Sequence, residues 1–122
     1  MNLRLLGALS AFIAVALGAF GAHALQGQLA PDLLAVFETG ARYHLVHALA
    51  IFAMGEAEAR EPARGWSAAG IAFVIGTVIF AGSLYALAMT GVRLWGAVTP
   101  FGGVAFLAGW LLAARAAWRS GR

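Results

Sequence analysis

Three long stretches without a charged side chain constrain this sequence more than any other feature. Leu5 to Leu25 and Leu94 to Ala114 each hold 21 residues, and Trp66 to Val92 holds 27. At about 1.5 Å per residue, a helix of about 20 residues crosses a hydrocarbon core roughly 30 Å thick. Each stretch therefore predicts a transmembrane helix, because a helix satisfies its own backbone hydrogen bonds in lipid.

The composition supports a membrane domain. Hydrophobic residues make up 62% of the chain and charged residues 11%, whereas a soluble domain carries about 25% charged residues. We therefore expect one integral membrane domain over residues 1–122. The chain has no cysteine, which excludes disulfides and thiolate metal sites. Its eight arginines are scattered beside the apolar stretches, so they are expected to contact headgroups and not nucleic acid.

The first apolar stretch resembles a secretory leader in one respect, since Arg4 precedes it and Ala22-His23-Ala24 has the form of a cleavage site. It is longer than the usual apolar core of about 7–15 residues in a leader, so we expect a retained helix over residues 5–25. Small residues would form one face of this helix and allow close packing in lipid. They are Gly7, Ala11, Ala14, Gly18 and Gly21.

Pro31 and Asp32 predict the start of the second long helix, with proline in its first turn and an acid near its positive end. Residues 31–39 are amphipathic and would lead into a span over residues 40–55. Spans over 66–90 and 94–114 follow. In the last one, either Thr99 caps a new helix or Pro100 kinks one continuous helix, and the kink is favoured. The predicted fold is an all-α bundle of four transmembrane helices.

The arginines predict how this bundle is oriented. Six lie on one side of a four-span arrangement, and only Arg42 and Arg93 lie on the other. Because positive charge is enriched in cytoplasmic segments, both termini are expected in the cytoplasm. The six are Arg4, Arg60, Arg64, Arg115, Arg119 and Arg122.

Five short motifs in order give the chain a family likeness. It resembles the small inner-membrane family catalogued as domain of unknown function 423, whose animal relatives are called transmembrane protein 256. The likeness implies four spans and the bacterial inner (cytoplasmic) membrane, and it supplies no activity or catalytic residue. The motifs are Gly18–Leu25, Tyr43–Ala50, Phe80–Leu87, Arg93–Gly96 and Thr99–Gly103.

The histidines are the first candidates for chemistry. His44 and His47 are three residues apart and share a helix face, and His23 ends the first span at what should be a similar depth. Together they could ligate zinc or copper, or a facing pair could hold a haem. Alternatively, the imidazoles form hydrogen bonds with Tyr43 or a backbone carbonyl and stabilise helix contacts, or they bind a polar ligand or a proton.

Charged and polar side chains supply further candidates. Glu38 and Arg42 have the favourable spacing and order for a helical ion pair, and they project away from His47. Arg42 is also suited to hold a lipid phosphate. Ser83 and Arg93 belong to a polar cluster at the outer end of the last two helices. The full set of candidate binding residues is His23, Glu38, Arg42, Tyr43, His44, His47, Ser83 and Arg93.

The sequence predicts a binding or assembly protein better than an enzyme. It holds no serine–histidine–acid set, phosphate loop or zincin helix, and no enzymatic activity or cofactor is expected. The leading hypothesis is an outer-leaflet polar site for a lipid headgroup or a partner helix. A small oligomeric channel or transporter is one alternative, and a histidine-ligated haem or metal protein is another. Membrane lipids and further copies of the chain are the expected partners.

Overall fold

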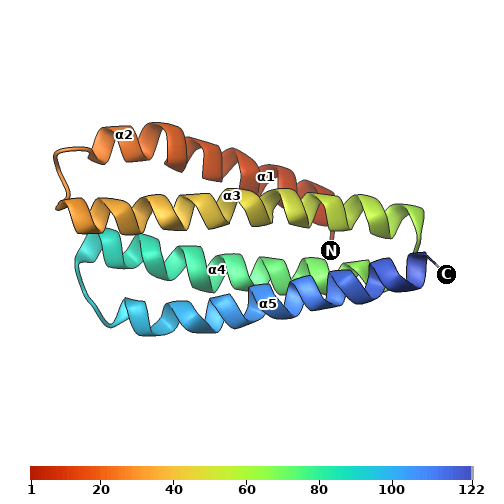
Figure 1. The fold of residues 1–122 in the computed structure, drawn as a ribbon. Helices are drawn as coiled ribbons and strands as arrows, with labels where there is room; N and C mark the ends of the chain where they lie inside the picture. Colours follow the sequence, from red (N-terminus) through yellow and green to blue (C-terminus); the bar gives the residue numbers. More distant parts are fainter. Residues whose placement is uncertain (122) are drawn as a thin grey trace.

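A computed structural model describes residues 1–121, and every long element in that range is helical. One rod is formed by α1, a π-helical segment and α2, which follow one another without a break; α3, α4 and α5 are the other three (Figure 1). The bounds are Leu3–Val15 for α1, Ala16–Gly21 for the π-helical segment, Ala22–Leu25 for α2, Pro31–Arg60 for α3, Trp66–Thr90 for α4 and Trp95–Ser120 for α5.

The rods lie side by side in the order α1, α3, α4, α5, with neighbours antiparallel (Figure 1). The chain termini and the connection at 61–65 lie at one end, here called the terminal end. The connections at 26–30 and 91–94 lie at the other, here called the turn end. With α1 on one flank and α4 on the other, α3 is the central element, and its apolar core includes Ile51 and Met54 against Phe73 and Phe106.

Glycines set how closely the rods approach. A Cβ added at Gly7 would lie 2.5 Å from the backbone nitrogen of Phe52, and one at Gly102 would lie closer still to that of Phe80. Such distances are far inside van der Waals contact, so a larger residue would push the helices apart. The small-residue face predicted for the first helix does pack on α3: Gly18 lies against Ala41.

The second long helix is longer than predicted. It runs from Pro31 to Arg60, whereas its span was expected to end at residue 55. Residues 56–60, which lie between the predicted spans, extend the helix because glutamate, alanine and arginine favour helix. The connection that follows is residues 61–65, and it contains Pro62. In α5 the backbone stays helical through Pro100, so Thr99 does not begin a new helix.

Within the described residues, three rods are long and apolar enough to cross a membrane: Leu3–Leu25, Trp66–Thr90 and Trp95–Ser120. Charged side chains are more frequent in α3 than in any of these three rods. The fold is therefore an all-helical membrane protein with three clear candidate spans and a fourth, more polar helix packed at their centre. The predicted topology signal from Arg122 lies outside the described residues.

Candidate functional site

His47 faces the interior, with 3% of its surface exposed. Its Nε2 accepts a hydrogen bond from Nε1 of Trp110 at 3.1 Å, and its Nδ1 lies 2.8 Å from the carbonyl oxygen of Tyr43. Because an indole N–H only donates, Nε2 carries no proton, and Nδ1–H must be the donor to the carbonyl. The ring stacks on Phe106 at 3.6 Å between centroids. These contacts favour one neutral tautomer of His47.

His44 joins three helices at one point. Its Nε2 lies 3.0 Å from the hydroxyl oxygen of Ser10 on α1, and its Nδ1 lies 2.9 Å from that of Tyr85 on α4. The imidazole is 6% exposed. Both hydroxyls donate and accept, so either neutral tautomer of His44 is satisfied. This histidine links the two helices that flank α3.

The structure does not bring the three histidines together. His23 is exposed on α2, and Gly21 beside it lies against Phe37, seven residues or about two helical turns from His44. Residues 1–121 contain no group of three histidine, aspartate or glutamate side chains placed to hold a metal ion. All four ring nitrogens of His44 and His47 already have protein partners. The expected shared depth of His23 and His44 was therefore wrong, and the metal or haem hypothesis gains no support.

Glu38 and Arg42 lie on the opposite, exposed side of α3, as the helical projection predicted. The ion pair expected between them is not formed. Within residues 1–121 the salt bridges join Arg4 to Glu56 at 3.4 Å and Arg93 to Asp32 at 2.9 Å. The two charged side chains on the outer face of α3 therefore have no ionic partner in the described part of the chain.

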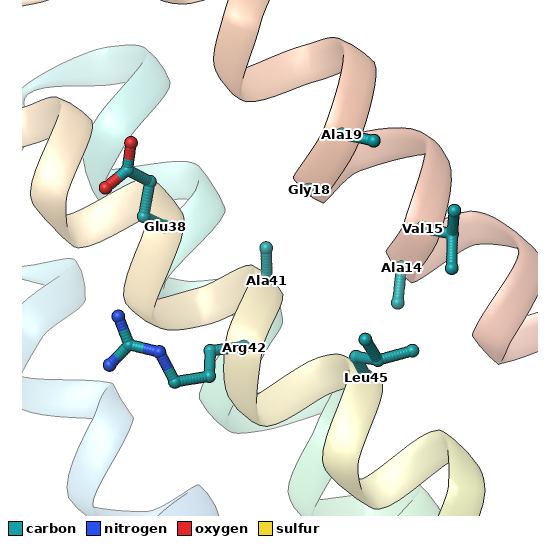
Figure 2. Close-up of a pocket in the computed structure, with 8 residues that line it drawn as sticks. All are labelled: Ala14, Val15, Gly18, Ala19, Glu38, Ala41, Arg42 and Leu45. Atoms are coloured by element: carbon teal, nitrogen blue, oxygen red, sulfur yellow. The ribbon is translucent and has the colours of Figure 1, made fainter.

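A shallow groove separates these charges from the first rod. Its volume is about 360 Å³. Figure 2 shows Ala41 and Leu45 between α3 and α1, with Glu38 one turn above Arg42, whose side chain extends away from α1. The wall from the first rod carries only small or apolar residues, and the charges stand on the α3 side alone. The lining residues are Ala14, Val15, Gly18, Ala19, Glu38, Ala41, Arg42 and Leu45.

A second groove, of about 390 Å³, lies over the buried histidine between α3 and α5. Its surface is aromatic and apolar, because Tyr43, Phe80 and Trp110 line it beside Leu107. Tyr43 is 43% exposed, and its ring is nearly parallel to that of His47. Since both ring nitrogens of His47 have protein partners, this groove offers apolar surface and no free imidazole.

The polar cluster predicted at the outer end of the last helices separates into two pairs. Ser83 is 3% exposed, and its hydroxyl lies 2.6 Å from that of Thr99, which joins α4 to α5. Arg93 lies in the turn between these helices and donates a hydrogen bond to Asp32 at the start of α3. That hydrogen bond lowers the pKa of Asp32. Ser83 and Arg93 thus connect neighbouring helices toward the turn end and do not share a binding site.

Sequence reasoning predicted the backbone carbonyl that accepts from His47, but it missed the side-chain partners of the polar groups. Ser10, Tyr85, Trp110 and Asp32 are the partners, each more than 30 residues away along the chain from the group it meets. Asp32 had been identified as a helix-start residue, but helical periodicity gives no information on which rods become neighbours. The packing order of the helices is what assigns these pairs.

Apolar helices of spanning length and charges confined mostly to the ends define a helical, multi-pass membrane protein. Residues 17–103 match the family described as "Protein of unknown function (DUF423)". The chain belongs to this family, as its motifs had indicated. It is a multi-pass protein of the bacterial inner membrane.

Two relatives illustrate the likeness. The UPF0382 membrane protein YwdK of Bacillus subtilis (strain 168) is 43% identical over 109 residues, which cover 88% of this chain and 89% of the relative. The UPF0382 inner membrane protein YgdD of Escherichia coli (strain K12) is 46% identical over 105 residues, which cover 86% and 80%. No solved structure matches the chain.

Proposed function

We propose that this protein is a non-enzymatic phospholipid-binding protein of the membrane, and that the groove between the first rod and α3 holds the lipid. One observation carries the proposal: Glu38 and Arg42 are exposed on α3, beside an apolar groove, without an ion pair in the described residues. A charge facing hydrocarbon costs at least about 2.5–3.5 kcal/mol near the middle of a bilayer. A partner from outside the chain would offset that cost.

The depth of Arg42 supports a phosphate as this partner. The Arg4–Glu56 salt bridge marks the polar boundary at the terminal end. Arg42 lies 14 residues before Glu56 on the same helix, or about 21 Å away. In a core roughly 30 Å thick, the Arg42 backbone is about 9 Å below the opposite boundary. Its long side chain can bridge much of this distance, and its guanidinium binds phosphate with paired N–H donors.

The proposal places α3 across the bilayer as a fourth span. In support, α3 packs antiparallel to α4, a candidate span, from Gly40 beside Leu84 to Met54 beside Gly70. A helix held along a spanning neighbour in this way crosses with it. Five of the six arginines predicted to be cytoplasmic lie in the described residues at the terminal end, which favours cytoplasmic termini and an outer-leaflet groove.

Native mass spectrometry of the protein extracted in a mild detergent tests this function. We expect the wild type to retain a phospholipid and Arg42→Gln to lose it, with about 10–100-fold weaker binding when lipid is added back, because one charge-assisted contact to phosphate is removed. Arg115→Gln is the matched control, since this exposed arginine lies near the terminal end of α5, away from the groove. It should bind lipid as the wild type does.

The same spectra report the alternative occupant, a second copy of the chain. A homo-oligomer was expected from the sequence, and an oligomer that keeps its lipid is compatible with the proposal. A lipid-free dimer that dissociates in Arg42→Gln would contradict it, because the guanidinium would then pair with another protomer. Equal lipid retention by wild type and Arg42→Gln would also contradict it.

A further inference from the structure

The two charges on the groove side of α3 are arranged in a definite order. Glu38 lies four residues nearer the turn end than Arg42, which is about 6 Å along the helix axis. Counted along α3 from Glu56 at the rise of one residue, the backbone of Glu38 is about 3 Å below the hydrocarbon boundary at the turn end, and that of Arg42 about 9 Å. Moving outward along the α3 wall of the groove, a ligand would pass the apolar side chain of Leu45, then Arg42, then Glu38.

We infer that the groove selects phospholipids whose headgroup ends in a primary ammonium, the phosphoethanolamine class; this rests on the lipid-binding function proposed above. In such a lipid the acyl chains join glycerol, the phosphate follows, and the ammonium lies farthest out. This order matches Leu45, Arg42 and Glu38 in turn along the α3 wall of the groove. A primary ammonium has three N–H donors for the carboxylate oxygens of Glu38, and the phosphate accepts from Arg42.

Competing headgroups fit this pair of charges less well. A phosphoglycerol headgroup satisfies Arg42 equally, but it is a net anion without a cation for Glu38, whose carboxylate repels it. A phosphocholine headgroup has a positive charge but no N–H donor, so it cannot form the hydrogen bonds that an ammonium forms with Glu38. The carboxylate is therefore the residue that sets specificity, and the guanidinium sets affinity for phosphate.

A competition experiment on delipidated protein tests the selectivity. Phosphatidylethanolamine, phosphatidylglycerol and phosphatidylcholine with identical acyl chains are added in equal amounts, and the bound lipids are counted by native mass spectrometry. We expect the wild type to favour phosphatidylethanolamine about tenfold, the ratio that one charge-assisted hydrogen bond confers. Glu38→Gln should still bind lipid but lose the preference. Asp32→Asn should keep it, since that carboxylate is engaged by Arg93.

The outcomes separate the two proposals. Arg42-dependent lipid binding without any headgroup preference would overturn the selectivity and leave the proposed function intact. A preference that persists in Glu38→Gln would also overturn it. Lipid binding that does not depend on Arg42 would overturn the proposed function itself. Because Glu38 is exposed and has no salt-bridge partner in the described chain, its variant should fold as the wild type does.

Discussion

The two sides of α3 carry polar residues in opposite circumstances. On the inner side, His44 and His47 are buried and each ring nitrogen has a partner from the protein. On the outer side, Glu38 and Arg42 are exposed and form no salt bridge within the described chain. The inner groups resemble those that stabilise helix contacts in membranes. The outer groups are the ones left to interact with something else.

This difference separates structural from binding roles within one helix. A buried polar group without a partner costs free energy, so the inner histidines are expected to affect folding when removed. In delipidated protein in a micelle, an exposed charge without its ligand contributes little to folding. Variants on the two sides should therefore differ in what they change. Substitutions on the inner side change the stability of the lipid-free protein, and substitutions on the outer side change only the stabilisation by added lipid.

The largest expected effect is that of His47→Ala. The substitution removes the ring stacked on Phe106 and the acceptor for Trp110, so we expect a loss of about 2–3 kcal/mol in the free energy of unfolding. Unfolding of the delipidated protein in mixed detergent micelles measures it. His23→Ala is the matched control, because His23 is exposed on α2, and it should unfold like the wild type. Equal unfolding of the two variants would show that His47 is not a structural group.

A smaller effect is expected where His44 links α1 and α4. Tyr85→Phe removes one of its hydrogen bonds and keeps the ring that packs near Phe37. We expect a loss of about 0.5–1.5 kcal/mol, the usual net contribution of one hydrogen bond. A double-mutant cycle with His44→Leu should give a coupling energy of similar size. Strict additivity of the two substitutions would mean that the hydrogen bond contributes nothing.

On the outer side, Arg42→Gln should change the unfolding free energy of delipidated protein by no more than about 0.5 kcal/mol, the range usual for exposed substitutions. The guanidinium has no salt-bridge partner among the described residues, so its removal breaks no ion pair there. The same detergent titration measures it beside His47→Ala. A loss of unfolding free energy as large as that of His47→Ala would contradict the claim that the outer side of α3 has no structural role.

The smallest effect concerns the Asp32–Arg93 salt bridge at the turn end. Arg93 lowers the pKa of Asp32 in the folded state, so the pair stabilises the fold above the unfolded-state pKa of about 3.9. This contribution is lost as the pH falls through the lowered folded-state pKa. The thermal midpoint of the wild type should fall slightly more than that of Asp32→Asn on acidification below about pH 4. Parallel pH profiles would mean that the exposed pair contributes nothing.

How much of this was predictable varies with the feature. Three apolar helices followed from uncharged stretches of membrane-spanning length, and the opposite directions of His47 and Arg42 followed from helical projection alone. The extension of α3 from residue 55 to Arg60 did not follow, because the charged residues 56–60 were placed outside the predicted span, although glutamate, alanine and arginine favour helix. The hydrogen bonds of His44 with Ser10 and Tyr85 could not be predicted either, since the periodicity of a single helix does not specify which helices become neighbours.

The most direct test is the shift in unfolding midpoint that added phospholipid produces in delipidated protein. A ligand that binds only the folded state raises the midpoint, by an amount that grows with the ratio of its free concentration to its dissociation constant. We predict that lipid raises the midpoints of wild type and His47→Ala alike, although the latter starts lower, and leaves Arg42→Gln nearly unchanged. Equal stabilisation of Arg42→Gln and wild type would contradict the claim that the outer side of α3 binds lipid.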